Sequence, residues 1–317
     1  MAVKAPFPWF GGKRRVAPAV WARFGNVRNY VEPFFGSGAV LLARPEPFTG
    51  TEAINDACGF VANFWRAIQA DPDAVARWVD WPVNEADLEA RHYWLVTEGR
   101  ARLDAVLGDP TGFDAQVAGW WCWGLCAWIG SGWCAGSGPW RWADGAWGKG
   151  GGAGVNRQLP HLGGTGCDSG RGVHKSSAEP NEWFSALAKR LRRVRVAHGD
   201  WSRVTSGTVT WRHGITAVFL DPPYSGAERT ANVYATDSGT VAAKARAWAI
   251  EEGARPDMRV ALCGYAGEHD MPGWSEFAWK AHGGYGGQGA GRGRDNAARE
   301  RIWFSPACLS EAEAGLI

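Results

Sequence analysis

The sequence predicts an α/β fold in which a ligand site forms at the carboxyl ends of buried parallel strands. Three observations support this prediction. The apolar run 217–220 is followed at once by Asp221-Pro222-Pro223-Tyr224, a short strand leads into the glycine turn Gly36-Ser37-Gly38, and a second short strand ends at Asp56, 18 positions after Gly38. Open α/β sheets bind ligands where their strands end, so these three points are expected to meet in one site.

The composition disfavours several classes of protein. The 34 Lys and Arg residues nearly balance the 32 Asp and Glu residues, for a formal net charge of +2, so any basic surface must be local. The seven cysteines form no Cys-x-x-Cys pair, which favours a reduced, cytoplasmic protein without zinc or disulfides. No apolar segment reaches the roughly 18 residues of a membrane span, and the first residues lack the apolar stretch of a secretion signal. We therefore expect a soluble protein with no membrane partner.

The segment 7–15 places a Gly-Gly turn and Lys13 immediately before a helix predicted over 16–24. Glycines let the backbone come close to a ligand, and the lysine is suited to meet a carboxylate. A plain turn with an exposed lysine is the alternative.

The glycine turn lies between a strand near Tyr30 and the start of a helix, which lets a nucleoside ligand approach a helix N-terminus. It lacks the third glycine of the dinucleotide fingerprint, and this disfavours a nicotinamide or flavin cofactor. Asp56 stands where a ribose-binding carboxylate is expected in such a unit. Residues 58–70 then predict an amphipathic helix whose aromatic side chains face the core.

The middle of the chain has a different character. Helices are predicted over 73–81 and 87–106, and an apolar helix is expected to end by residue 129. The segment 130–175 is too rich in glycine for regular structure and is expected to be a long functional loop. Its tryptophans and basic residues suit stacking and phosphate contacts with nucleic acid, although a protein-contact loop is the alternative. The basic residues are Arg141, Lys149, Arg157, Arg171 and Lys175, while His161, Cys167 and His174 match no strong zinc spacing.

The last third of the chain again alternates helices and strands. A helix is predicted over 181–194, a strand over 194–201 that ends in His198-Gly199-Asp200-Trp201, the strand 217–220, a helix over 238–253 and a strand over 259–263. The run 301–305 is expected to be an edge or hairpin strand, preceded by a flexible basic loop at 283–294.

The segment Asp221-Pro222-Pro223-Tyr224 forms a corner that suits a planar amino group. The prolines stiffen the backbone and have no N–H, so their neighbourhood offers carbonyl oxygens as acceptors. Asp221 adds a carboxylate acceptor and Tyr224 a flat apolar face. A strand that ends in a proline turn without any chemistry is the alternative.

In this order along the chain, the motifs resemble those of the Dam-like (D12 class, alpha group) DNA adenine N6-methyltransferases, which use S-adenosylmethionine. The segment 9–13 is similar to the family's amino-terminal cofactor motif, and 32–38 to its glycine motif. Asn55-Asp56 is similar to its ribose-binding acid, Gly199-Asp200-Trp201 to the motif before the catalytic strand, and 221–224 to the catalytic motif. Trp9 and Trp201 stand where Tyr or Phe is common, which should preserve stacking.

The resemblance implies a Rossmann-like methyltransferase sheet flanked by helices. Residues 1–70 and 181–317 would form the catalytic domain, and 71–180 an inserted target-recognition region. Asp56 would hold the cofactor ribose, Trp201 its adenine, and Lys13 with Glu32 its methionine end. The full set of implied cofactor-binding residues is Trp9, Gly12, Lys13, Glu32, Pro33, Phe34, Gly36, Gly38, Asp56, Asp200, Trp201 and Asp221.

The implied reaction is direct methyl transfer to the exocyclic amine of a flipped adenine, with S-adenosylhomocysteine as product and no metal. Asp221 and the Pro222 carbonyl would accept the amine N–H groups, with Pro223 completing the corner, and Tyr224 would stack on the base. DNA contacts are expected from Arg141, Lys149, Arg157, Arg171, Lys175 and Arg229.

The inserted region departs from the usual recognition module and is similar to that of phage-type homologues, so the recognition sequence does not transfer. We expect a monomer, with a dimer as the alternative, and a setting in restriction-modification. Cytosine N4 remains an alternative target, and a catalytically silent DNA-binding or regulatory protein an alternative function. A nicotinamide oxidoreductase is the third alternative, disfavoured by the incomplete fingerprint.

Overall fold

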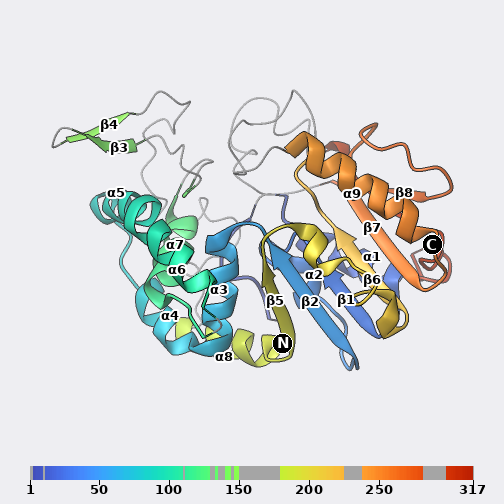
Figure 1. Cartoon of the computed structure of the whole chain (residues 1–317), viewed down its shortest axis with the longest axis horizontal. Coiled ribbons are helices and arrows are strands. Elements are labelled where there is room, and N and C mark those ends of the chain that lie inside the picture. Colours follow the sequence, from blue (N-terminus) through green and yellow to red (C-terminus); the bar gives the residue numbers. More distant parts are fainter. Residues whose placement is uncertain are drawn as a thin grey trace.

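The structure is a computed structural model of the 317-residue chain (Figure 1). It describes residues 3–9, 11–109, 111–128, 133–134, 140–143, 146–149, 179–224, 238–280 and 298–316. Within these ranges, none of the helices combines the length and the apolar character needed to cross a membrane.

A seven-stranded sheet forms the centre of the fold, in the order β5-β2-β1-β6-β7-β9-β8. The first five strands in this order are parallel: β5 (Val194–His198), β2 (Thr51–Asp56), β1 (Asn29–Glu32), β6 (Thr216–Leu220) and β7 (Met258–Tyr265). β9 (Glu300–Phe304) runs antiparallel between β7 and β8 (Ser275–Ala278). The predicted α/β class is confirmed. The chain order reverses at β1, which lies between β2 and β6, and open sheets bind ligands at such a switch point.

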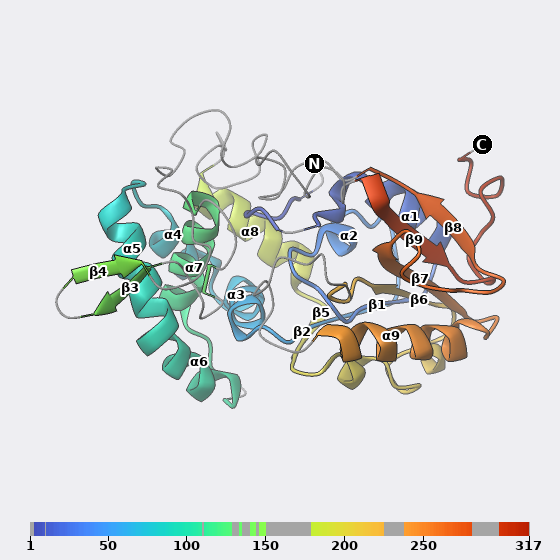
Figure 2. The same cartoon turned by 90° about the horizontal axis from the view of Figure 1, so that it is seen from above.

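Both faces of the sheet are buried at its centre, where alternate residues of β1, β2, β6, β7 and β9 belong to two different cores. In β6, Ala217 and Phe219 pack into one core, whereas Val218 and Leu220 pack into the other. All five residues of β6 are buried, which explains why the sequence shows a continuous apolar run rather than an alternating one. α1 (Ala17–Phe24) and α2 (Ala39–Leu42) lie on one face and α9 (Ser238–Gly253) on the other (Figure 2).

A group of helices lies beside the β5 end of the sheet (Figures 1 and 2). α4 packs on α7 and α8, and α3 packs on the same two helices. Trp65 of α3 and Trp121 of α7 belong to the same core as the sheet residue Ile54. The members are α3 (Gly59–Ala70), α4 (Pro72–Val79), α5 (Glu85–Trp94), α6 (Arg100–Leu107), α7 (Ala115–Ala127) and α8 (Pro180–Leu191), with a π-helical segment, Leu95–Gly99, between α5 and α6.

One expectation about strands is wrong. β3 (Trp140–Ala143) and β4 (Ala146–Lys149) form an antiparallel hairpin inside the segment expected to lack regular structure. The high glycine content of the whole segment concealed these two short runs, which contain a single glycine, Gly148. The predicted strand at 301–305 does form a hairpin strand, β9, but it is not at the edge of the sheet, because β8 covers it.

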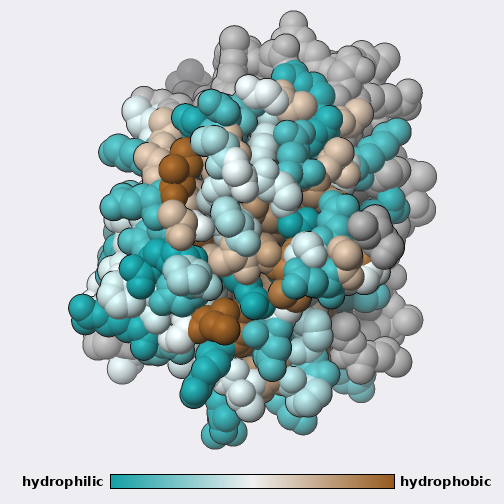
Figure 3. All heavy atoms as spheres, turned by 90° about the vertical axis from the view of Figure 1, so that its right-hand side faces the viewer, coloured by the Kyte–Doolittle hydropathy of each residue, from teal (hydrophilic) through white to brown (hydrophobic). Residues whose placement is uncertain are grey.

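β8 was not predicted, because three of its four residues are exposed and it carries no apolar periodicity. The side of the molecule on the right of Figure 1 is largely hydrophilic, with hydrophobic residues in small separate groups (Figure 3). An edge strand with polar side chains suits such a surface. The expected basic loop at 283–294 lies outside the described residues.

A buried ion cluster ties α8 to the amino-terminal part of the sheet. Glu52 at the start of β2 is 5% exposed and accepts from Arg190 at 2.7 Å and from Arg44 at 3.1 Å. Both guanidinium groups also lie over the ring of Phe48, at 4.2 Å for Arg44 and 4.9 Å for Arg190. Removing the carboxylate would leave two cations partly buried without their counter-ion.

We expect Glu52→Ala to lower the free energy of unfolding by about 3–5 kcal/mol, because breaking a buried pair leaves uncompensated charge. Urea denaturation at pH 7 measures this. The matched control is Glu98→Ala, which removes an exposed partner of Arg102 at 2.9 Å and should cost only a few tenths of a kcal/mol. Equal losses in the two variants would contradict this interpretation of the cluster.

Candidate functional site

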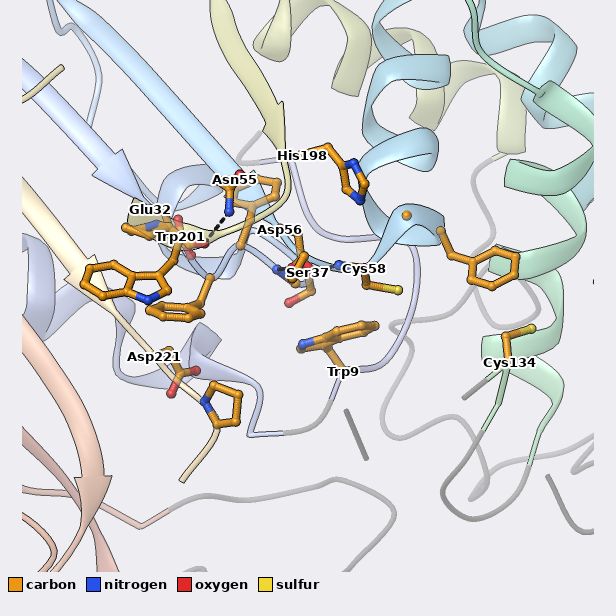
Figure 4. A pocket seen from close by; sticks show the side chains of 18 of the residues that line it. Trp9, Glu32, Ser37, Asn55, Asp56, Cys58, Cys134, His198, Trp201 and Asp221 are labelled. Atoms are coloured by element: carbon orange, nitrogen blue, oxygen red, sulfur yellow. Dashed lines mark hydrogen bonds between the residues drawn. The ribbon is translucent and has the colours of Figure 1, made fainter. Parts of the chain in front are cut away.

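A cavity of about 580 Å³ opens where the parallel strands end. Figure 4 shows Asp221 and Trp201 at one end of it, Asp56, Ser37, Cys58 and Trp9 in the middle, and Cys134 at the other end. The cavity brings together eleven of the twelve predicted cofactor residues: Trp9, Gly12, Lys13, Glu32, Pro33, Phe34, Gly36, Asp56, Asp200, Trp201 and Asp221. Gly38, the remaining one, is the N-cap of α2.

The glycine turn needs glycine at both positions. Gly36 and Gly38 have φ angles of 49° and 65°, in the left-handed region that favours glycine. A β-carbon on Gly36 would lie 2.2 Å from the indole nitrogen of Trp9. The turn therefore lets the Trp9 ring pack directly against the backbone at the floor of the cavity.

Asp56 holds this turn in place. One of its carboxylate oxygens accepts from the Gly36 N–H at 2.9 Å and the other from the Cys58 N–H at 2.8 Å. Burial raises the pKa of Asp56 to about 6, although the two backbone hydrogen bonds oppose this shift. The carboxylate therefore titrates just below neutral pH.

Glu32 ends β1 and is 3% exposed. Its carboxylate accepts from the Tyr30 hydroxyl at 2.8 Å and from the Leu41 N–H at 3.2 Å. Burial raises the pKa of Glu32 to about 8, and both hydrogen bonds oppose the rise. At neutral pH this acid is mostly protonated, and a cationic group placed beside it would favour its ionised form.

Asn55, which precedes the predicted ribose-binding Asp56, has a structural role in the site that the sequence did not indicate. Its side-chain amide donates to the carbonyls of Pro33 at 3.1 Å and Gly199 at 2.9 Å, and so fixes the glycine motif to the end of β5. Beyond Gly199, Trp201 is 8% exposed and stacks on Phe34 with ring centres 5.9 Å apart. Asp200 caps the short helix η4 (Trp201–Val204) through the Ser202 N–H.

Lys13 is 4% exposed and pairs with Asp221 at 2.9 Å. Its ammonium also donates to the Gly11 carbonyl at 2.9 Å and to the Tyr224 hydroxyl at 3.0 Å. Burial alone would lower the pKa of Lys13, but the carboxylates of Asp221 and Glu300 outweigh burial and raise it. The cation is therefore permanent.

The four residues of the predicted catalytic motif occupy different positions. Asp221 and Pro223 line the cavity, whereas Pro222 is buried. Tyr224 turns its hydroxyl to Glu300 at 2.8 Å and to Asp221 at 3.2 Å. Glu300 is a residue that sequence reasoning missed, since a lone acid at the start of an apolar strand carries no motif.

The far end of the cavity was also not anticipated. It is formed by helices of the group beside β5, and it adds aromatic, aliphatic and charged side chains beyond Asp56. These residues are Arg100, Leu103, Asp104 and Leu107 from the α6 region and Trp121, Leu125, Trp128, Trp133 and Cys134 from α7 and beyond.

The predicted DNA-contacting residues are only partly covered by the structure. Arg141 lies in β3 and Lys149 in β4, opposite Gly148 and Trp140 respectively. Arg157, Arg171, Lys175 and Arg229 lie outside the described residues, as do His161, Cys167 and His174. In the described part of the chain, no three His, Cys, Asp or Glu side chains come together as metal ligands.

Comparison with known proteins finds a similarity for the amino-terminal part of this site. Residues 9–96 match the model of the D12 class N6 adenine-specific DNA methyltransferases. The matched segment contains Trp9, Lys13, Glu32, the glycine turn and Asp56, whereas Asp221 lies beyond it. No curated protein matches the chain. Residues 9–96 are thus similar to the D12 class of N6 adenine-specific DNA methyltransferases, and this similarity implies S-adenosylmethionine-dependent methylation of adenine N6 in DNA.

Proposed function

We propose that the chain methylates adenine N6 at specific DNA sites, on a base flipped out of the duplex, and that Asp221 acts on the target amine. The observation that carries this proposal is the position of Asp221. It follows β6 directly, lines the same cavity as the glycine turn and Asp56, and is held by Lys13 at 2.9 Å. Nucleobases must leave the stack to reach such a recessed carboxylate.

The residues of the cavity fit S-adenosylmethionine. Its volume of about 580 Å³ is typical of small-molecule sites. Asp56 would accept from the ribose hydroxyls, Glu32 would face the methionine ammonium, and Trp9 and Trp201 would flank the flat adenine ring. Gly36 lets the Trp9 ring pack against the backbone, which places this ring beside the proposed cofactor site.

The bound cofactor supplies an electrophilic methyl group. The adenine amine is a weak nucleophile, because its lone pair is delocalised into the ring. Asp221 and the Pro222 carbonyl would accept its N–H bonds, which favours the pyramidal form and stabilises the positive charge that develops on nitrogen. Lys13 orients Asp221 for this role and cannot itself accept a proton while it is charged.

We further propose the division into a catalytic domain, 1–70 and 181–317, and a target-recognition region, 71–180. The helices of the second part share a core with α3 and α8, so the two parts would move little relative to each other. The proposal includes a metal-independent, monomeric enzyme of phage type that acts on DNA in the cytoplasm, in a restriction-modification setting. Tyr224 would stack on the flipped adenine.

We expect Asp221→Asn to reduce methyl transfer by at least about 100-fold, the scale on which a single polar group contributes to a transition state. Binding of S-adenosylhomocysteine should change little, because the amine rather than the cofactor loses its acceptor. Asn is the better replacement than Ala, since its side-chain oxygen can still accept from Lys13, whose other carboxylate partner, Glu300, is 3.8 Å away. Radiolabelled methyl transfer and calorimetry measure the two quantities.

Mass spectrometry of nucleosides from the treated DNA identifies the base. N6-methyladenine from the wild-type protein and none from Asp221→Asn is the expected result. Detection of N4-methylcytosine instead would show that cytosine is the target base. Near-normal turnover of Asp221→Asn would refute the role of Asp221.

We expect the affinity for S-adenosylhomocysteine to fall up to about tenfold from pH 7 to pH 5, because Asp56 titrates with a pKa of about 6. The sign follows from the ribose hydroxyls, which donate better to the ionised acid than to the protonated one. Calorimetry at several pH values measures this. Asp56→Asn should bind more weakly at pH 7 and show no such dependence. If the dependence persists in that variant, the titrating group lies elsewhere, for example at His198.

A further inference from the structure

A continuous hydrogen-bonded chain leads from the proposed catalytic acid to a third carboxyl group. The Tyr224 hydroxyl lies 3.2 Å from Asp221 Oδ1 and 2.8 Å from Glu300 Oε2. The shorter distance gives the hydroxyl hydrogen to Glu300. Lys13 donates to the same hydroxyl oxygen at 3.0 Å, so the phenol is oriented from two sides.

Glu300 is placed by the sheet rather than by a loop. It begins β9, directly opposite Tyr265 of β7, and is 4% exposed. The ring of Tyr265 packs edge-on against that of Tyr224, with centres 4.6 Å apart. Two strands and an aromatic contact thus hold a carboxylate next to the predicted catalytic motif. Burying a charge there is costly unless the charge is paired and hydrogen-bonded.

The proposed reaction creates a need for such a group. Methyl transfer leaves the N6 nitrogen with one proton too many, and Asp221 is the acceptor in contact with the amine. Lys13 cannot take this proton, because its ammonium has only donors. Burial raises the pKa of Glu300, with Lys13 opposing the rise, so this acid takes up a proton more readily than an exposed glutamate does.

We propose that Glu300 is the final acceptor of a proton relay, which removes the amine proton from Asp221 through the Tyr224 hydroxyl. This proposal rests on the proposed function. The N–H bond of the methylated amine breaks, and its proton forms an O–H bond on Asp221. That proton passes to the Tyr224 oxygen as the original hydroxyl proton passes to Glu300. The net result is a neutral amine, an ionised Asp221, an unchanged tyrosine and a protonated Glu300, which returns its proton to water after product release.

The ring and the hydroxyl of Tyr224 have separate roles in this proposal. The face of the ring would stack on the adenine, and the hydroxyl at its edge would transfer the proton. Glu300 does not touch the substrate and acts through Tyr224, so it is a positioning residue. The titratable or charged groups that face Glu300 are Lys13, Asp221, Tyr224, Cys263, Tyr265 and Glu268.

The test is the single-turnover rate of Glu300→Gln at saturating cofactor and DNA. Glutamine still accepts a hydrogen bond from Tyr224 but is a far weaker base. We expect the rate to fall about 100-fold, the lower end of the range for general acid–base groups. The wild-type rate should also decrease as pH falls through the Glu300 pKa, and the variant should lack this decrease. Glu276→Gln on the neighbouring strand β8, which removes the charge from an exposed partner of Arg301, is the matched control and should leave the rate unchanged.

Tyr224→Phe keeps the stacking face but interrupts the chain, and should cost about as much as Glu300→Gln, with no further loss in the double variant. Infrared difference spectra of a single turnover should show a protonated carboxyl in the wild type and not in Glu300→Gln. A near-normal rate in Glu300→Gln, or additive losses in the double variant, would overturn the relay. These results are distinct from failure of the function itself, in which the wild-type protein would methylate no DNA.

Discussion

The buried contact between Lys13 and Asp221 is the constraint on which the rest of the site depends. Lys13 begins a short 3-10 helix, Lys13–Arg15, near the amino terminus, Asp221 follows β6, and their charged atoms are 2.9 Å apart. A charge in this position is unfavourable unless it is paired and hydrogen-bonded, so each residue fixes the other. Through this contact the Gly-Gly turn, Asp221 at the end of β6 and Tyr224 form one unit.

The sheet explains why these groups meet. β1, β2 and β6 are parallel neighbours, so Glu32, Asp56 and Asp221 leave their strands at the same edge. Asn55 closes the arrangement by joining the carbonyls of Pro33 and Gly199. The cavity is therefore a consequence of strand order, and the three acids at these strand ends differ because their surroundings differ. Asp56 is hydrogen-bonded to backbone, Glu32 to a phenol, and Asp221 to a lysine.

Much of this was predictable from the sequence, and the reason is local. Buried parallel strands appear in the sequence as apolar runs, and the glycine turn requires its glycines. Glu32, Asp56 and Asp221 lie directly at strand ends. Glu300 was not predictable, because its role depends on the pairing of β9 with β7, which brings it to Tyr224 from far along the chain. β8 was missed because its side chains are mostly exposed. The hairpin of β3 and β4 was missed because the glycine content of the segment around it obscured two short runs.

The central claim is that this chain methylates adenine N6 in DNA, with Asp221 and the pocket around Asp56 as its active site. Sequencing that detects modified bases, applied to DNA from cells that express the protein, tests it most directly. The account predicts N6-methyladenine at every copy of one short sequence, and its loss in cells that express Asp221→Asn. DNA without modified adenine, or with modified cytosine instead, would contradict the claim.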